Sequence, residues 1–484
     1  MARPHARPTA ENNLGKVKVY PIESIDLEAN GISRIDGKVC FVRGALPGEL
    51  VRAEVIRSKS KYDVAQTLAV LKESSQRVKP VCPHFGVCGG CSMQHLTPQA
   101  QLAIKQRGLE DQLWHLSRVR PETLLRPISG PAWGYRYRAR LSVRLVTKKG
   151  GVLVGFHERA SGFVADMREC KILEPRVDAL LMPLRALIDT LSIRHCMPQI
   201  EVAVGERLVT DEPRGRVPPG VTRDYSARAK ELVVALVFRI LEHPSDLDED
   251  KFLAFAQKHH IELWYQPKGP DTIYLFCNEN GRVEDTEEVS QLGYYLPEYG
   301  IHMPFKPTDF TQVNHSINTV LVGQAVRLLD PQSGDQVADL FCGLGNFSLP
   351  LATRATSVLG IEGAKSLTQR ARDAAAHNGL SDKTEFKTRN LFELSFKDWR
   401  ALGPFDRVLI DPPREGALAV VQALAEDRRK PKRVVYVSCN PSTLARDAGV
   451  LCNGGGWVLK ATGAVNMFPH TSHVESISVF EPSH

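Results

Sequence analysis

The stretch Gln336-Val337-Ala338-Asp339-Leu340-Phe341-Cys342-Gly343-Leu344-Gly345 decides the fold of this 484-residue chain. Residues 336–341 are an apolar run of strand length, and the remainder holds two glycines that allow a tight backbone turn. Comparable runs follow downstream, separated by helix-like segments, at residues 358–362, 384–388, 407–410, 433–437, 458–468 and 474–480. Strands that alternate with helices in this way predict an α/β fold with a doubly wound sheet.

Polar and reactive side chains stand where these strands end. In a doubly wound sheet the ligand lies beyond the carboxyl ends of the strands. The candidates at this rim are Asp339, Glu362, Asn390, Asp411, Cys439 and Glu475. Glycines 343 and 345 let the backbone approach a ligand, and Glu362 can accept hydrogen bonds from two ribose hydroxyls. No Gly-Lys-Ser/Thr follows, so the pattern favours S-adenosylmethionine over a nucleoside triphosphate or NAD.

The segment Ser438–Pro441 places Cys439 directly after an apolar run. Alone, such a cysteine is more often a buried structural residue, but the glycine turn and the other polar residues at strand ends favour a nucleophile. Carbon 5 of a pyrimidine has no lone pair, so a thiolate must first add to carbon 6, and a base must later remove the proton from carbon 5. We expect Cys439 to be the nucleophile and Glu475 the base. A positive neighbour such as Arg414 would favour the thiolate.

The N-terminal region is expected to be a small β-barrel. Short alternating runs between residues 16 and 72 are broken by glycine turns, which predicts an OB-like barrel. Four basic side chains are expected to contact an RNA backbone there, with a solvated strand edge as the alternative. They are Arg52, Arg57, Lys59 and Lys61.

The middle of the chain is expected to form an α+β domain. Thr97-Pro98 predicts the start of a helix over 97–118, one that can pack on the catalytic domain. Strand-like runs at 141–146, 152–156, 200–204, 232–238 and 261–265 predict an antiparallel sheet, and 211–230 a surface loop. Interleaved aromatic and basic residues, Trp133, Tyr135, Arg136, Tyr137, Arg138 and Arg140, fit either RNA stacking and phosphate binding or a buried strand. The predicted domains are 15–75, 76–300 and 301–484.

Three cysteines lie within ten residues, at Cys82, Cys88 and Cys91, among glycines that permit a tight turn. Cys170 can supply a fourth ligand, since it follows a strand-rich stretch. Four thiolates suit zinc or an iron-sulfur cluster, and the pattern alone leaves both open.

Composition sets wide limits. The net charge of +7 favours a polyanionic partner but also fits ordinary surface charge. No run approaches the ~20 apolar residues of a membrane helix, and the start of the chain lacks the apolar core of a signal peptide. We therefore expect a cytoplasmic protein whose ten cysteines do not form a disulfide framework.

These motifs together resemble the RNA (uracil-5-)-methyltransferase family over nearly the whole chain. The matching stretches are Asp309–Asn314, Asp339–Pro350, Asp411–Gly416, Ser438–Asp447 and His470–Ser476. The resemblance implies a class I S-adenosylmethionine-dependent fold, with Cys439 as nucleophile and Glu475 as base. It also implies cofactor contacts from Gln312, Phe341, Asn346, Glu362, Asn390 and Asp411.

The N-terminal barrel resembles a TRAM domain, and barrel plus cysteines resemble the branch of the family that acts on 23S ribosomal RNA. That resemblance implies methylation of carbon 5 of one uracil, expected at position 1939, and a 4Fe-4S cluster on Cys82, Cys88, Cys91 and Cys170 with a structural role. No protein partner is inferred. The alternatives are a non-catalytic RNA-binding or ribosome-assembly protein, an iron-sulfur redox enzyme, and methylation of another rRNA or tRNA uracil.

Overall fold

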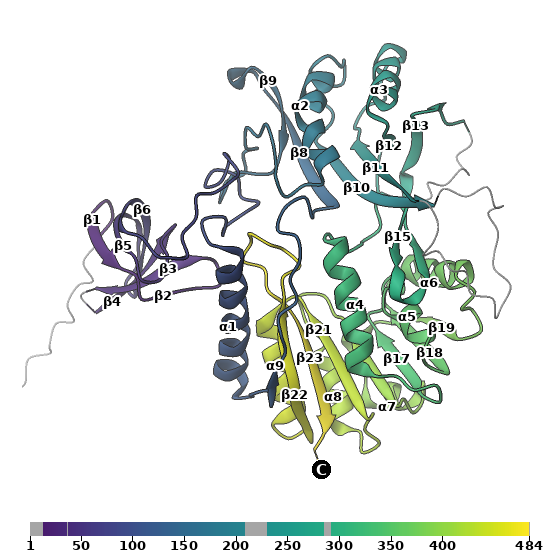
Figure 1. Ribbon diagram of the computed structural model, residues 1–484. Coiled ribbons are helices and arrows are strands. Elements are labelled where there is room, and N and C mark those ends of the chain that lie inside the picture. The colour runs from purple at the N-terminus through teal and green to yellow at the C-terminus, as the bar shows by residue number, and fades with distance from the viewer. Residues whose placement is uncertain (1–12, 36, 209–229, 285–291, 484) are drawn as a thin grey trace, which may run out of the picture. The chain divides into compact units, whose positions relative to one another are not determined.

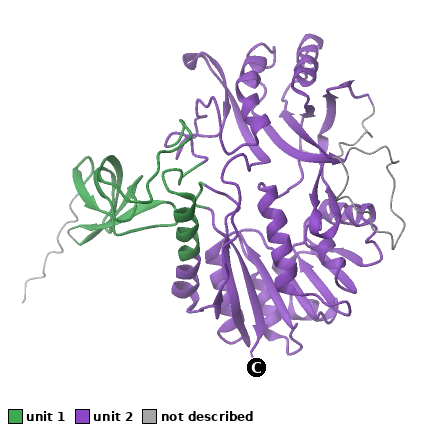
Figure 2. Cartoon of the chain, in the orientation of Figure 1, with its two compact units in different colours: residues 1–85, 91–108, 470–472 green, residues 86–90, 109–469, 473–484 purple. Residues whose placement is uncertain are grey.

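The computed structural model describes residues 13–35, 37–208, 230–284 and 292–483 (Figure 1). The chain forms two compact units (Figure 2). Unit 1 comprises residues 1–85, 91–108 and 470–472, and unit 2 comprises 86–90, 109–469 and 473–484. The three-domain division predicted from the sequence stays a prediction.

Unit 1 contains a six-stranded, barrel-like sheet in the order β1-β5-β6-β4-β3-β2. Its strands are β1 (Val17–Pro21), β2 (Ser24–Ile25), β3 (Asn30–Ile35), β4 (Lys38–Arg43), β5 (Leu50–Ser58) and β6 (Tyr62–Lys72). Side chains alternate along β5, where Val51, Ala53 and Val55 are buried and Arg52 is exposed. This alternation gives the sheet one apolar face, which forms its core.

Helix α1 (Pro98–Ser117) begins where the sequence predicts. The Thr97 hydroxyl accepts a hydrogen bond from the Ala100 N–H at 3.3 Å, as an N-cap does. The second half of α1 belongs to unit 2, where Gln112 accepts a hydrogen bond from the Ser442 hydroxyl at 3.0 Å. This part of the helix therefore contacts α9 (Pro441–Cys452).

Unit 2 contains a nine-stranded sheet in the central region, with the path β14-β13-β12-β11-β10-β15-β16 and with β8 and β9 attached to β10. Its strands are β8 (Arg138–Val146), β9 (Gly151–Gly155), β10 (Gln199–Leu208), β11 (Lys230–Arg239), β12 (Glu262–Gln266), β13 (Tyr274–Asn278), β14 (Gly281–Arg282), β15 (Gly293–Leu296) and β16 (Ile301–Pro304). Helices α2 (Pro175–Asp189) and α3 (Asp246–His259) pack on it.

The sequence predicts the longer strands of this sheet but not β13 to β16, which are too short to show a periodic pattern. All strand pairs are antiparallel except β11 with β12, which is parallel. Residues 211–229 of the predicted surface loop lie outside the described residues, and Lys230 begins β11.

The second sheet of unit 2 has the order β19-β18-β17-β20-β21-β23-β22-β7. Its strands are β7 (Thr123–Leu124), β17 (Gln336–Leu340), β18 (Ser357–Glu362), β19 (Thr384–Thr388), β20 (Arg407–Ile410), β21 (Arg433–Ser438), β22 (Trp457–Val465) and β23 (Glu475–Pro482). Strands β19 to β21 are parallel, and β23 is antiparallel to β21. The predicted doubly wound sheet is confirmed.

Strand β17 marks the switch point of this sheet, because the chain continues from it to β18 on one side and later to β20 on the other. A crevice for a ligand is expected beyond its carboxyl end. The accompanying helices are α4 (His315–Leu329), α5 (Ser348–Ala352), α6 (Lys365–His377), α7 (Phe396–Leu402), α8 (Leu418–Glu426) and α9 (Pro441–Cys452). Within the described ranges, no helix has the length and apolar character of a bilayer span.

Candidate active site

The turn after β17 has the backbone that its glycines were expected to supply. Gly343 and Gly345 adopt positive φ angles of 55° and 90°, and a Cβ added at Gly343 would meet no atom within 4 Å. Phe341 also has a positive φ, 64°, and its ring packs on Phe392 at 5.5 Å between centroids. The turn therefore leaves open space for a ligand beside its backbone.

Glu362 is fixed beside this turn. Its carboxylate accepts the Gly343 N–H at 3.2 Å and the Ala364 N–H at 3.0 Å. Each carboxylate oxygen still has a free acceptor direction, so the group can receive two hydroxyls of a ribose. The structure thus orients Glu362 as the cofactor hypothesis requires.

Two carboxyl groups lie at the ends of neighbouring strands, Asp339, which is buried, and Asp411, which is half-buried. Asp339, in β17, accepts a hydrogen bond from the Ser348 hydroxyl, while its Oδ1 has no hydrogen-bond partner among the described residues. Burial raises the pKa of Asp339 to about 7. Burial also raises the pKa of Asp411, which follows β20, to about 7, and the negative charge of Asp339 adds to this shift. An unpaired buried acceptor beside the glycine turn is a further sign of a ligand site.

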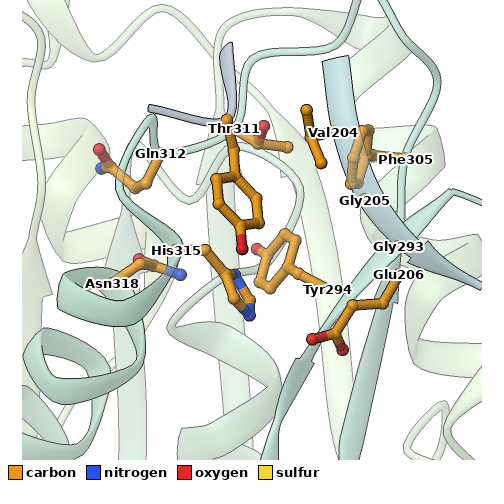
Figure 3. Close-up of a pocket in the computed structure, with 11 residues that line it drawn as sticks. Val204, Gly205, Glu206, Gly293, Tyr294, Phe305, Thr311, Gln312, His315 and Asn318 are labelled. Carbon is orange, nitrogen blue, oxygen red and sulfur yellow. The ribbon is translucent and has the colours of Figure 1, made fainter. Parts of the chain in front are cut away.

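Asn346 is held by an amide pair and a phenol. It exchanges two hydrogen bonds with Asn318 of α4, both at 3.0 Å, and accepts the Tyr294 hydroxyl at 2.8 Å. Tyr294, Asn318 and Gln312 line one pocket together with His315 (Figure 3). The sequence did not single out Tyr294 or Asn318, because a residue that acts by holding another leaves no motif of its own.

Asn390 is exposed and caps a short 3-10 helix, since its side chain accepts the Phe392 N–H at 3.1 Å. Phe392 in turn packs on Phe341, so Asn390 connects with the glycine turn. Asn390, Phe341 and Glu362 are thus connected with the glycine turn. Asn346 bonds to Asn318, which lines one pocket with Gln312. The contacts of all six predicted residues with a cofactor stay predictions.

The register of the sheet places Cys439 beside Glu475. Ser438, the last residue of β21, pairs with Ser476 of β23, so Cys439 and Glu475 are the next residues across the antiparallel pair. Residues directly across such a pair have Cβ atoms ~5 Å apart. Strand β20, which ends just before Asp411, is the neighbour of β21 on the other side. One thiol thus lies between two carboxyl groups.

Burial and the neighbouring charges set the pKa of the Cys439 thiol. Burial raises the pKa of Cys439 to about 11, and the negative charges of Glu475 and Asp411 raise it further, whereas Arg414 acts in the opposite direction. The predicted help from Arg414 is therefore present but outweighed. In the protein without substrate the Cys439 side chain is a thiol at neutral pH.

The turn that carries Asp411 and Arg414 is anchored by α9. The Arg414 carbonyl accepts hydrogen bonds from the Asn440 amide at 3.0 Å and the Thr443 hydroxyl at 3.2 Å. The fully buried Asp447 accepts the Tyr436 hydroxyl at 2.7 Å. Because β21, α9 and this turn are bonded together, Cys439 and Asp411 hold a fixed relation.

The aromatic and basic segment before β8 serves mainly as structure. The guanidinium of the half-buried Arg138 donates to the carbonyls of Pro307 and Asp309, and the Tyr135 hydroxyl donates to the Pro469 carbonyl at 2.9 Å. Arg140 pairs with Glu201 at 2.8 Å. Tyr135 precedes β8 and Arg138 begins it, and both bond to backbone carbonyls within unit 2. The RNA contacts expected of this segment stay a prediction.

None of the four candidate metal cysteines is joined in a disulfide within the described residues. Cys88 and Cys170, in unit 2, are buried, and Cys82 and Cys91, in unit 1, are half-buried. The Cys88 sulfur accepts the Gly90 N–H at 3.4 Å. A sulfur that receives a backbone N–H is typical of iron-sulfur ligands, whose potentials depend on such bonds.

Comparisons with known proteins identify the families that this chain resembles. The family described as tRNA (Uracil-5-)-methyltransferase matches residues 296–481, and the TRAM domain matches residues 16–67. A solved structure, the tRNA (uracil-54, C5)-methyltransferase of Pyrococcus abyssi in complex with S-adenosyl-L-homocysteine, has a TM-score of 0.68 at 22% identity and covers 96% of this chain and 99% of its own. That likeness shows the shared class I methyltransferase fold.

Two relatives are similar over nearly their whole length, and both are named 23S rRNA (uracil(1939)-C(5))-methyltransferase RlmD. The protein from Cupriavidus pinatubonensis is 57% identical over 478 residues, which cover 96% of each chain. The protein from Cupriavidus necator is 57% identical over 471 residues, which cover 95% of this chain and 99% of its own. The resemblance stated from the motifs is thereby confirmed, and the chain belongs to the RlmD family of 23S rRNA (uracil(1939)-C(5))-methyltransferases.

Proposed function

We propose that this protein transfers a methyl group from S-adenosylmethionine to carbon 5 of uracil 1939 in 23S ribosomal RNA. The relatives that cover nearly all of the chain carry this activity in their names. The observation that carries the proposal is the register that puts the Cys439 thiol across from Glu475, next to the strand that leads to Asp411. Methylation at carbon 5 needs a nucleophile that adds to carbon 6 and a base that removes the carbon-5 proton, and a thiol and a carboxylate lie together here.

The cofactor would lie beyond β17. Glu362 would accept the ribose hydroxyls, and Asn346, held by Asn318, would face the same crevice. Gln312, Phe341, Asn390 and Asp411 complete the proposed set. When bound, S-adenosylmethionine supplies an electrophilic methyl group.

Each of the two carboxyl groups beside the thiol would accept one proton during the reaction. Asp411, with a pKa of about 7, accepts the thiol proton, and its own charge then no longer opposes the thiolate. The Cys439 sulfur would add to carbon 6 of the uracil and so make carbon 5 nucleophilic toward the methyl group that bound S-adenosylmethionine would supply, with S-adenosylhomocysteine as the leaving group. Glu475 removes the proton from carbon 5, the electron pair re-forms the 5,6 double bond, and the sulfur leaves.

A stacked uracil cannot reach Cys439, so the target base must be unstacked at a cost of a few kcal/mol. The β5 side of the TRAM region supplies Arg52, Arg57, Lys59 and Lys61, all of which are exposed to solvent. Their charges would attract the RNA backbone. A ribosomal substrate would place the reaction in the cytoplasm.

We propose further that Cys82, Cys88, Cys91 and Cys170 hold a 4Fe-4S cluster. Four soft thiolate donors suit such a cluster and leave no iron position open for chemistry, which fits a structural role. Iron and acid-labile sulfide in anaerobically purified protein test this. The proposal requires about four irons per chain and their loss in Cys170→Ser. Stoichiometric zinc without sulfide would contradict it.

The methylation itself is tested with unmodified 23S ribosomal RNA and labelled S-adenosylmethionine. Label should enter 5-methyluridine at position 1939, and Cys439→Ala should abolish the transfer. Cys452→Ser, at the far end of α9, is the matched control and should retain activity. Label at another uracil would replace the proposed target, and RNA binding without any label would support a non-catalytic binding protein.

A further inference from the structure

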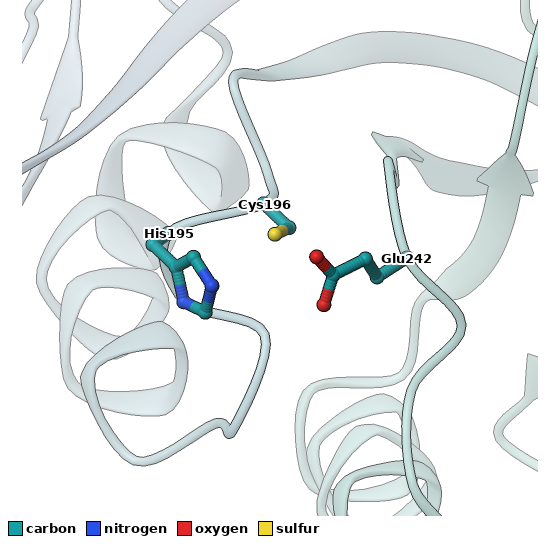
Figure 4. Close-up of side chains that lie close together, drawn as sticks. All are labelled: His195, Cys196 and Glu242. Carbon is teal, nitrogen blue, oxygen red and sulfur yellow. The ribbon is translucent and has the colours of Figure 1, made fainter.

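A second group of side chains with donor atoms suited to a metal ion lies after Cys170 in the sequence. His195, Cys196 and Glu242 each offer one donor atom, and these three atoms lie within 4.8 Å of one another (Figure 4). The Cys196 side chain is buried, with 7% of its surface exposed, and the other two residues are exposed. A buried sulfur beneath two accessible oxygen and nitrogen donors makes a site that a hydrated ion can enter.

The two loops that carry these residues are held together by the backbone. Cys196 precedes β10, and Glu242 follows β11, its antiparallel neighbour. The Leu241 N–H donates to the Cys196 carbonyl at 2.9 Å. The carboxylate of Asp248, near the start of α3, accepts the Ser192 N–H at 3.1 Å and so ties the first loop to that helix. The donors therefore stand on a rigid frame rather than on free loops.

The donor set has the chemistry of a zinc ligand sphere. Zinc in proteins is bound by cysteine sulfur at ~2.3 Å, histidine nitrogen at ~2.0 Å and carboxylate oxygen at ~2.1 Å. Such bonds place neighbouring tetrahedral ligands roughly 3.3 to 3.8 Å apart. Side-chain rotations of the exposed His195 and Glu242 cover the remaining difference from 4.8 Å.

We propose that His195, Cys196 and Glu242 bind one divalent ion of the zinc class, with water in the fourth position. In the metal-free protein the Cys196 thiol donates a hydrogen bond to the Glu242 carboxylate. Binding releases the thiol proton to solvent, and the thiolate and carboxylate then balance the two charges of the ion. The bound ion would hold together the two loops at one end of the β10–β11 pair.

The test measures zinc and iron together in anaerobically purified full-length protein. After equilibrium dialysis against buffered Zn²⁺, the wild type should hold one zinc per chain more than His195→Ala, Cys196→Ser and Glu242→Gln. Its iron content should equal theirs. The neighbouring His243→Ala and the distant Cys452→Ser are matched controls and should bind as much zinc as the wild type.

Equal zinc in the wild type and Cys196→Ser would overturn the proposal, as would an equal loss in His243→Ala. Glu242→Gln guards against misfolding, because it changes one exposed atom. A Co²⁺ difference spectrum between wild type and Cys196→Ser should show a thiolate-to-metal charge-transfer band, and its absence would also overturn the site.

Discussion

The reactivity of Cys439 toward an alkylating agent tests the electrostatics of the active site. Its pKa of about 11, against a usual value of 9.0, implies a thiolate fraction near 10⁻³ at pH 8, compared with ~0.1 for an ordinary thiol. A more basic thiolate is intrinsically more nucleophilic, with a Brønsted slope of ~0.4–0.5, which recovers about tenfold. The net expectation is alkylation about tenfold slower than that of an ordinary thiol.

The assay follows iodoacetamide labelling of the Cys439 peptide by mass spectrometry in protein without RNA. The logarithm of the rate should rise with unit slope from pH 7 to pH 10, because deprotonation is incomplete throughout this range. Glu475→Gln removes the nearest opposing charge and should accelerate labelling roughly three- to tenfold at pH 8. Glu481→Gln, at the other end of β23, is the control and should leave the rate unchanged.

A plateau in rate below pH 8 would refute this reasoning, since it would mean that the thiolate is already formed in the free protein. An unchanged rate in Glu475→Gln would refute the coupling of the two groups.

Four further outcomes are expected. Glu475→Gln should slow product release at least ~100-fold and let a covalent RNA adduct accumulate on a denaturing gel. Glu362→Ala should weaken binding of S-adenosyl-L-homocysteine by roughly 10- to 100-fold in titration calorimetry, because charged hydrogen bonds contribute ~1.5–3 kcal/mol. Asn318→Ala should leave the side-chain amide N–H of Asn346 without its acceptor, at a cost of ~1–3 kcal/mol. Both the cofactor affinity and the melting temperature should therefore fall. Arg407→Ala should lower the free energy of unfolding by ~1–3 kcal/mol in urea, because the buried Asp335 loses its partner at 2.6 Å and keeps only the exposed Lys432 as a cationic neighbour. In the wild type this ion-pair contribution is present at neutral pH and is lost as the pH falls, since the pKa of Asp335 is lowered in the folded state.

The sequence predicts the catalytic sheet closely because its central parallel strands are largely apolar runs, although the edge strand β19 is mostly polar. The predicted bounds of β19 and β20 match those observed, and β17 differs by one residue. The reason is physical, since strands covered on both faces must be apolar throughout. Strands such as β14, with two residues, carry no such signal.

The sequence likewise predicts some residues of the candidate site and misses others. Residues at strand ends, such as Cys439 and Glu362, can be found because a motif and a strand coincide. Tyr294 acts across 52 residues of chain on Asn346, and only the folded structure brings them together. The raised pKa of Cys439 was also not foreseen, because it arises from burial and from two carboxylates of other strands.

Trapping the enzyme on RNA that contains 5-fluorouridine at position 1939 tests the central claim most directly. Fluorine at carbon 5 cannot be removed as a cation, so the base step fails after methyl transfer and the sulfur stays bonded to carbon 6. We expect a denaturation-resistant adduct that forms only with S-adenosylmethionine, maps to Cys439 and is absent in Cys439→Ala. An adduct on another residue, or normal methylation by Cys439→Ala, would contradict it.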